Sequence, residues 1–217
     1  MSPSELLARQ LEQMNIHLSR EGIDALISFM DELLRWNRRI NLTAITDPQE
    51  AVEKHLVDSL TLLPLLQGDE RVLDLGSGGG FPCLPLKIAL PRLRIVSVDA
   101  VQKKIVFQRH AVRLLGLDHF EAFHGRAEDL PQISRYAAGF DVVLSRAFTS
   151  LPSFAALARP CLAPGGRIVA MKGAGGEREL TEAQRQMEAL GLQCREVRRL
   201  RLPASGAERT LLVFMEK

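Results

Sequence analysis

The sequence predicts an α/β protein with a mostly parallel, twisted sheet, a helical segment before it and an antiparallel hairpin at its end. From residue 71 onward, short apolar runs alternate with helical segments, a pattern typical of βαβ units. The stretch 192–217 then contains two strand-like runs separated by the turn-forming PASG of 203–206. Strands joined by so short a turn pair antiparallel, so the hairpin should close one edge of the sheet.

Length and composition predict a globular protein of ordinary type. The chain has 217 residues, of which 46% are hydrophobic and 25% charged. We expect an N-terminal helical extension, residues 1–66, packed on a core formed by residues 67–217. The apolar runs are too short for a membrane span, and the acidic N-terminus lacks the apolar stretch of a secretory signal. Three widely spaced cysteines favour a reducing compartment, so we expect a cytoplasmic protein.

The first 66 residues are predicted to be helical. Apolar residues recur at helical spacing on one face of the stretch 23–34: Ile23, Leu26, Ile27, Met30, Leu33 and Leu34. A further helix should begin at Pro48, because Asp47 is a suitable capping acid and Glu50 stands three residues after it. We expect that helix to continue to about Pro64.

The remaining chain predicts strands that alternate with helices. The first five strands should cover 71–75, 94–99, 120–125, 140–146 and 167–172. The helices between and after them should cover 82–90, 101–115, 151–161 and 177–190. In a sheet of this kind a ligand binds in the crevice beyond the carboxyl ends of the strands. The loops that follow the first four strands are therefore the candidate site.

The loop after the first strand reads DLGSGGGFP, residues 74–82. A dinucleotide fingerprint requires G-x-G-x-x-G, but the third glycine position counted from Gly76 is Phe81. The spacing is instead G-x-G-x-G after an acidic residue, which is typical of loops that hold S-adenosylmethionine. Gly76 and Gly78 are the glycines of interest, because a backbone without Cβ atoms can approach a ligand closely. A tight strand-to-helix turn without a ligand is the alternative.

Polar residues follow the next three strands. Asp99 ends the second strand, where a carboxylate can accept hydrogen bonds from both ribose hydroxyls, although an ordinary strand-end acid is the alternative. Ala127 and Glu128 lie in GRAEDL after the third strand, in a position suited to an adenine ring; Glu128 could equally stabilise a helix N-terminus. The segment 145–147, Ser-Arg-Ala, ends the fourth strand beside the expected position of the methyl group.

Four separated motifs resemble one known protein family, the bacterial ribosomal RNA small subunit methyltransferase G family, also called glucose-inhibited division protein B. The motifs are NLTAITDPQEAVEKHLVDSL, VLDLGSGGGFPCLPLKIALP, HGRAEDL and VLSRAFTSL. The resemblance covers nearly the whole chain. It implies a class I (Rossmann-like) methyltransferase fold that transfers a methyl group from S-adenosylmethionine to N7 of one guanine in 16S ribosomal RNA. It places cofactor contacts at Gly76, Phe81, Ala127, Glu128 and Arg146. Cys83 departs from the family, which more often has glycine there, and we expect this to alter packing rather than chemistry.

The implied reaction fits the residues present. Guanine N7 has an in-plane lone pair and no proton, so it can attack a methyl sulfonium without a general base, and we name no catalytic residue. The fourth-strand segment lacks the Asn/Asp-Pro-Pro-aromatic motif expected of enzymes that methylate exocyclic amines. Arg146 should bind either the cofactor carboxylate or an RNA phosphate, and the sequence leaves both open. The expected partner is 16S ribosomal RNA or the small ribosomal subunit, without membrane contact, and the chain should act as a monomer.

The distribution of charge favours a polyanionic partner. Residues 1–70 contain 6 Lys or Arg and 12 Asp or Glu, whereas the glycine-rich remainder is basic, with 22 and 14. Chance segregation of surface charge is the alternative. The basic candidates for RNA contact are Arg35, Arg38 and Arg39 around Trp36, then Lys103, Lys104, Arg109 and Arg113, and finally Arg198, Arg199 and Arg201. Trp36 could stack on an unpaired base, although a tryptophan at the end of an amphipathic helix is more often part of the core.

Three other functions remain as alternatives. A small-molecule methyltransferase on the same fold would have a closed apolar pocket, a nicotinamide-dependent oxidoreductase would need the third glycine, and an RNA-binding protein could keep a vestigial cofactor loop. The Pro-Cys pairs at Cys83 and Cys161 resemble those of cytosine-C5 methyltransferases. Neither pair follows the fourth strand, so we expect buried small residues. The histidines show no metal-ligand spacing, and we predict no metal.

Overall fold

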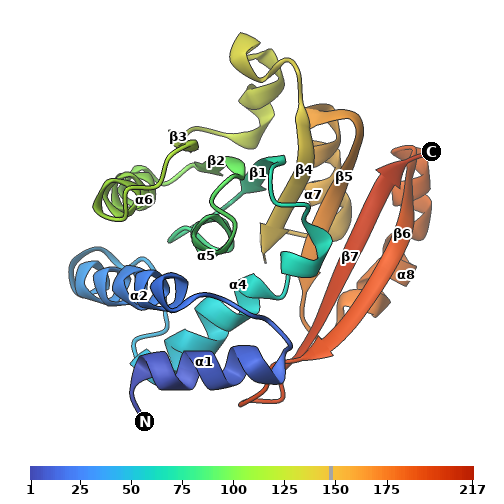
Figure 1. Ribbon diagram of the computed structural model, residues 1–217. Helices are drawn as coiled ribbons and strands as arrows, with labels where there is room; N and C mark the ends of the chain where they lie inside the picture. Colours follow the sequence, from blue (N-terminus) through green and yellow to red (C-terminus); the bar gives the residue numbers. More distant parts are fainter. Residues whose placement is uncertain (147–148) are drawn as a thin grey trace.

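The computed structural model describes residues 1–146 and 149–217, and its centre is a seven-stranded sheet with the order β3-β2-β1-β4-β5-β7-β6 (Figure 1). The strands are β1 (Arg71–Leu75), β2 (Arg94–Asp99), β3 (Phe120–His124), β4 (Phe140–Arg146), β5 (Leu162–Lys172), β6 (Leu192–Arg201) and β7 (Glu208–Glu216). β1 to β5 pair parallel, whereas β7 pairs antiparallel with both β5 and β6. The predicted α/β class and the closing hairpin are both confirmed.

Helices cover both faces of this sheet. The longer ones are α1 (Pro3–Gln13), α2 (Arg20–Ile40), α5 (Cys83–Ala89), α6 (Gln102–Leu114), α7 (Leu151–Ala158) and α8 (Gly176–Ala189). Short 3₁₀ segments are η2 (Leu63–Leu65), η3 (Ala127–Gln132), η4 (Ser134–Tyr136) and η5 (Arg159–Cys161). Within the described part of the chain, no helix combines the length and the apolar character that a membrane crossing requires.

The predicted helix from Pro48 to Pro64 is wrong as a continuous α-helix. Asp47 caps it as expected, by accepting a hydrogen bond from the Glu50 backbone N–H at 2.8 Å. The segment then divides into α3 (Pro48–Ala51), the π-helical η1 (Val52–Val57) and α4 (Asp58–Leu60). Within η1 the carbonyl of Lys54 accepts a hydrogen bond from Arg146 at the end of β4. A side chain that engages a helical carbonyl is a known cause of such irregularity, and sequence periodicity does not report it.

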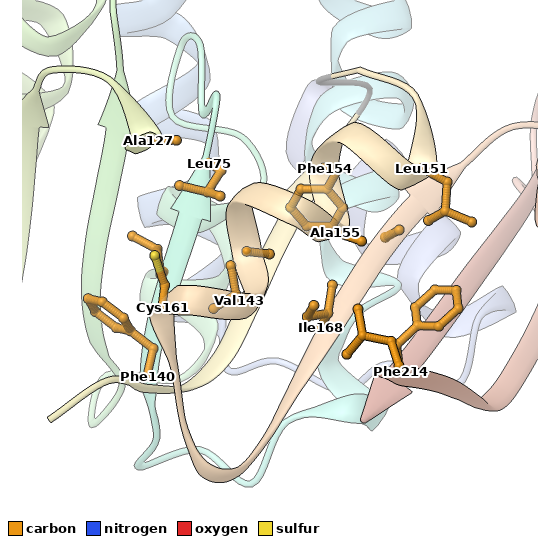
Figure 2. Packing of buried hydrophobic residues seen from close by; sticks show 14 of the residues in the cluster. Leu75, Ala127, Phe140, Val143, Leu151, Phe154, Ala155, Cys161, Ile168 and Phe214 are labelled. Atoms are coloured by element: carbon orange, nitrogen blue, oxygen red, sulfur yellow. The ribbon is translucent and has the colours of Figure 1, made fainter. Parts of the chain in front are cut away.

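Three apolar clusters hold the layers together. One lies between the sheet and the layer of α7, α8 and η3; Figure 2 shows part of it, with Phe154 and Ala155 of α7 over Val143 and Ile168 of the sheet. A second lies on the opposite face, between the sheet and α5. The third joins α1 and α2 to α5 and α6, so the N-terminal helices form an outer layer over the second face. Burial on this scale favours folding by roughly 25 cal/mol for each Å² of apolar surface removed from water.

The N-terminal helices also contact the hairpin through buried carboxylates. Glu53 of η1 accepts hydrogen bonds from the backbone N–H groups of Ala204 and Ser205, in the turn between β6 and β7. Asp58 of α4 accepts one from Arg209 of β7 at 2.7 Å. Both carboxylates are almost inaccessible to solvent. Polar contacts therefore fix where the extension lies, in addition to apolar packing.

Candidate functional site at the carboxyl edge of the sheet

A cleft of about 490 Å³ lies at the carboxyl ends of β1, β2 and β3. It is lined by Gly76, Val98, Asp99, Ala100, Lys104, Gly125, Arg126, Ala127 and Glu128. Four of the seven residues predicted to bind a cofactor therefore lie together: Gly76, Asp99, Ala127 and Glu128. They come from three loops, and the first and last of these residues are 52 positions apart in the sequence. The site is the crevice that a parallel sheet of this topology is expected to use.

The glycine loop has a backbone that other residues rarely adopt. Gly76, Gly78 and Gly80 all have positive φ, at 72°, 59° and 93°. A Cβ added at Gly80 would lie 2.4 Å from Leu84, whereas one added at Gly78 would meet no atom of the described chain within 4 Å. Gly80 is thus required by the packing of the protein, and Gly78 leaves open space beside the loop. Open space over a backbone that only glycine adopts readily is compatible with a closely bound ligand.

A buried polar network fixes the loop from beneath. The Ser97 hydroxyl of β2 lies 2.6 Å from the Ser77 hydroxyl and 2.5 Å from Gln108 Oε1 of α6. The Gln108 amide donates to Ser77 Oγ and to the Gly78 carbonyl, each at 2.8 Å. Sequence reasoning missed Ser97 and Gln108. The available signals were a serine inside an apolar strand and a glutamine at an inward position of α6.

Asp99 connects the glycine loop to the end of β2. One carboxylate oxygen accepts a hydrogen bond from the Gly78 N–H at 2.9 Å, and the other accepts one from Val101 N–H at 2.8 Å. Lys104 Nζ lies 3.5 Å from the same carboxylate, so this lysine, considered above for RNA contact, lines the cleft. Carboxylate oxygens retain further acceptor capacity, which is the capacity that ribose hydroxyls would use.

Asp74, the acid before the loop, is fully buried. Its Oδ2 accepts a hydrogen bond from the Cys83 N–H at 3.2 Å, while Oδ1 has no partner among the described residues. Burial raises the pKa of Asp74 to about 7, against the opposing effect of the hydrogen bonds from Cys83. A buried acceptor without a partner is costly, and it marks a place that a donor from a ligand or an ordered water would fill.

Phe81 and Arg146 lie outside the lining of the cleft. The Arg146 guanidinium stands 5.0 Å from the centre of the Phe81 ring and donates to the Lys54 carbonyl at 2.9 Å. It also lies 3.4 Å from Asp58 Oδ2. The His55 ring stacks on Phe81 at 4.4 Å. The two predicted residues therefore meet each other and the N-terminal extension, behind the glycine loop.

The His55 ring is neutral in this arrangement. Burial, and after it the charge of Arg146, lowers the pKa of His55 to about 3. Arg146 Nη2 lies 3.4 Å from His55 Nδ1, and His55 Nε2 lies 2.8 Å from Thr43 Oγ1. A neutral ring can accept from the guanidinium through Nδ1 and donate to the hydroxyl through Nε2, which satisfies both nitrogens.

Most of the other basic candidates have intramolecular partners. Arg198, Arg199 and Arg201 pair with Glu196, Glu177 and Glu208, respectively. Arg109 donates twice to the Ala122 carbonyl. The predicted burial of Cys83 and Cys161 is confirmed. No group of metal-ligating side chains occurs in residues 1–146 and 149–217, and Ala147 of the predicted Ser-Arg-Ala segment lies outside the described residues.

Comparison with known proteins finds close relatives of this chain. A family model described as rRNA small subunit methyltransferase G matches residues 22–210. Ribosomal RNA small subunit methyltransferase G of Geobacter sp. (strain M21) is 52% identical over 98% of this chain and 97% of that protein. The protein of the same name from Geobacter sulfurreducens is 50% identical over 95% and 94%.

Solved structures share the fold at much lower identity. Aeropyrum pernix fibrillarin with natively bound S-adenosyl-L-methionine has a TM-score of 0.58 at 18% identity, covering 74% of each chain. The ribosomal protein L11 methylase of Lactobacillus delbrueckii subsp. bulgaricus has a TM-score of 0.56 at 12% identity, covering 80% of this chain and 81% of that one. At this identity the likeness concerns the fold alone.

The buried network predicts a combined loss of stability and cofactor affinity. Gln108→Leu should cost about 1–3 kcal/mol in the free energy of unfolding, because two serine hydroxyls and the Gly78 carbonyl lose a buried partner. It should also weaken S-adenosylmethionine binding, because the loop is then held less firmly. Urea denaturation and calorimetric titration measure the two effects. Gln102→Leu, on the exposed start of the same helix, should change stability by about 0.5 kcal/mol or less. Equal effects of the two variants would contradict this role of the network.

The pKa of Asp74 predicts a pH-dependent stability. The pKa of about 7 in the folded protein exceeds the ordinary 3.8, so the folded state binds more protons between these values. The contribution of Asp74 to stability therefore falls as the pH rises from about 4 to about 7, and it is constant above that window. Asp74→Asn should remove this fall. As the pH rises from about 4 to about 7, the unfolding free energy of the wild type should therefore fall relative to that of the variant. A difference independent of pH would contradict the raised pKa.

Proposed function

The chain belongs to the rRNA small subunit methyltransferase G family, and we propose that the cleft at the carboxyl ends of β1, β2 and β3 is its S-adenosylmethionine site. It is an S-adenosylmethionine-dependent methyltransferase that acts on N7 of a guanine in 16S ribosomal RNA. The observation that supports this placement is the convergence of Gly76, Asp99, Ala127 and Glu128 on one cleft.

The residues of the cleft fit the cofactor by their chemistry. Asp99 offers carboxylate acceptors for ribose hydroxyls, and the segment of Ala127 and Glu128 offers a wall for the adenine ring. The glycine loop offers backbone for the amino-acid portion, with Gly76 in the lining and the space beside Gly78 open. The unpartnered Oδ1 of Asp74 lies at the base of this loop and would accept a hydrogen bond from an ammonium group or from a water bound to it.

Phe81 and Arg146 complete the proposed site from behind the loop. The Phe81 side chain is engaged by His55 and Arg146, and its N–H donates to the Ser77 carbonyl at 2.8 Å, so we propose that Phe81 shapes the loop that a cofactor contacts. Arg146 is held by the Lys54 carbonyl and Asp58, and binding a cofactor carboxylate or an RNA phosphate would require it to exchange the weaker of these contacts. We propose that Arg146 positions the loop wall and accepts one of those anions when the complex forms.

The reaction makes limited demands on the protein. The cofactor supplies a methyl group on a positively charged sulfur. Guanine N7 forms a bond to that carbon with its own lone pair, the carbon–sulfur bond breaks, and its electron pair remains on sulfur. No proton moves, so the residues of the cleft act by orienting the two reactants in line and by excluding water. The positive charge passes from sulfur to the purine, which favours walls without a fixed cation at the transfer point.

The form of the partner follows from the target atom. N7 faces the major groove, which in A-form RNA is too deep and narrow for a protein to read. We propose that the target lies in a loop or distorted segment of 16S ribosomal RNA, alone or within the small subunit, and that its base turns out of the stack at a cost of a few kcal/mol.

We further propose that residues 1–66 act as an extension of a methyltransferase domain, 67–217. We also propose that the chain acts as a monomer and, because its substrate is ribosomal RNA, that it acts in the cytoplasm.

The cofactor loop yields a prediction with a matched control. Gly78→Val and Gly116→Val place the same side chain at a similar φ, 59° and 61°, with no atom of the described chain near the added Cβ in either case. Both should lose about 1–2 kcal/mol of stability through the strained backbone. Only Gly78→Val should abolish S-adenosylmethionine binding, because Gly116 lies at the far end of α6. The measurement is calorimetric titration of both folded variants, and retained affinity in Gly78→Val would contradict the site.

The target atom yields a second prediction. Replacing the target guanine of the RNA by 7-deazaguanine keeps pairing and stacking but removes the nucleophile. Methyl transfer should then vanish, while RNA affinity measured without cofactor should persist. Transfer of a labelled methyl group and filter binding measure the two quantities. Continued methylation of that nucleotide would exclude N7 as the acceptor.

A further inference from the structure

We propose that α2 carries a preformed RNA-binding platform, in which an unpaired base stacks on Trp36 and adjacent phosphates bind Arg35 and Arg39. The platform consists of Arg35, Trp36, Arg39 and Ile40 of α2 with His110 of α6, which together line a cavity of about 390 Å³. The proposal rests on the proposed function, because it takes the substrate to be an RNA with unpaired nucleotides. It adds a second point of RNA contact, away from the cofactor cleft.

The aromatic part of the platform is partly packed and partly open. The Trp36 ring packs edge-on against Phe107 of α6 at 5.6 Å and lies 4.9 Å from the His110 ring. It is only half-buried, and it lines the cavity rather than filling it. The packing that the sequence favoured for Trp36 is therefore present on one side of the ring, and the stacking role stays a proposal. One side of the ring belongs to the apolar contact between α2 and α6, and the remainder is available to a base.

A buried carboxylate holds the platform in one arrangement. Glu32 Oε1 accepts hydrogen bonds from Arg35 Nη2 at 2.6 Å and from Trp36 Nε1 at 2.7 Å, and it lies 2.6 Å from His110 Nε2. Glu32 is 7% exposed. Burial pushes the pKa of this carboxyl upward, but the hydrogen bonds from Arg35, His110 and Trp36 outweigh burial and lower it, so Glu32 is ionised.

The presence of Glu32 distinguishes a binding surface from simple core packing. Burying a charged group costs free energy unless each of its lone pairs is well satisfied, and an apolar residue would serve the contact of α2 with α6 better. What the carboxylate contributes is orientation, because a guanidinium, an indole and an imidazole are all fixed by one oxygen atom. Groups that are oriented before binding lose less entropy when a ligand arrives.

The positive charge of the platform favours a nucleic acid as its ligand. Three of the six Lys or Arg residues in positions 1–70 stand at 35–39, although that part of the chain is acidic overall. The Arg35 side chain is 69% exposed despite its contact with Glu32, and Arg38 and Arg39 are exposed. One buried carboxylate cannot neutralise three arginines. An oriented aromatic ring beside unneutralised guanidinium groups is the arrangement that stacks a base and holds its phosphates.

The position of the platform suits substrate positioning. One turn before Trp36 on the same helix, Leu33 packs on the cofactor loop, where a Cβ added at Gly79 would lie 3.1 Å from Leu33 Cδ1. Phe29, one turn earlier still, lies 5.3 Å from the Phe81 ring. A nucleotide held on Trp36 is thus tied through a single helix to the glycine loop, on the side of that loop away from the cleft.

The experiment uses Trp36 itself as the reporter, because it is the only tryptophan in the chain. The fluorescence of the wild-type protein is followed while a 16S ribosomal RNA fragment that the protein methylates is added. Stacking should quench the emission in proportion to binding. In parallel, RNA affinity is measured for Trp36→Leu, Trp36→Phe, Arg39→Gln and the control Arg20→Gln, which removes an exposed charge at the other end of the same helix.

Trp36→Leu should weaken RNA binding about 5- to 100-fold, the range for loss of one stacked base, and Trp36→Phe should recover most of that loss. Arg39→Gln should reduce the salt dependence of binding by about one phosphate contact, and Arg20→Gln should leave it unchanged. S-adenosylmethionine affinity should be the same in all four variants. If Trp36→Leu fails to fold, the quenching of wild-type fluorescence and the salt dependence of RNA binding by Arg39→Gln still test the platform.

The outcomes separate this inference from the proposed function. Methylation of the RNA by the wild type, together with unquenched Trp36 emission at saturation and unaltered binding by Arg39→Gln, would overturn the platform alone. Absence of methylation by the wild type would overturn the proposed function instead. An equal loss of RNA affinity in Arg20→Gln would show a diffuse charge effect and would also overturn the platform.

Discussion

The structure of the site depends on one contact, the hydrogen bond from the Gly78 N–H to the Asp99 carboxylate. It joins the loop after β1 to the end of β2, so that two neighbouring parallel strands present their loops as one surface. The contact is possible because the strands pair in register, with Leu75 beside Val98. It also requires a positive φ at Gly78, which turns the N–H toward the carboxylate. The Ser77, Ser97 and Gln108 network supports the same loop from the core side.

The N-terminal helices are joined to this site by buried charges rather than by apolar packing alone. Asp58 lies between Arg146 at the end of β4 and Arg209 at the start of β7, and Glu53 holds the turn between β6 and β7. Removing one partner of a buried pair typically costs about 3–5 kcal/mol, because the other charge is left unsatisfied. Apolar contacts tolerate small shifts, whereas these directional contacts specify a single position. The N-terminal helices are thereby fixed relative to the carboxyl edge of the sheet.

Sequence reasoning located the strands well and led to residues that line one cleft, because both depend on local patterns. The apolar runs placed β1, β2 and β4 at their observed bounds, and the glycine loop and Asp99 led to the cleft. The π-helical segment Val52–Val57 was missed because a residue that contacts it, Arg146, stands about ninety positions away. For the same reason the sequence could not tell that Arg146 and Phe81 would face the extension, or that Lys104 would line the cleft. Periodicity reports which face of a helix is buried, but not which distant side chain meets it.

The kind of reaction explains where the buried polar groups are found. A methyl transfer to guanine N7 moves no proton, so the protein gains nothing from a base tuned to neutral pH and gains much from rigid alignment. Buried groups are accordingly used for orientation. Gln108 and Ser97 fix the cofactor loop, Arg146 and His55 fix the Phe81 ring, and Glu32 fixes Trp36. Gln108, Ser97, His55 and Glu32 lie behind the surface that a reactant would touch, whereas Arg146 stands at its edge. A rigid second layer is what aligns a small cofactor and a large RNA within the fraction of an ångström that in-line transfer requires.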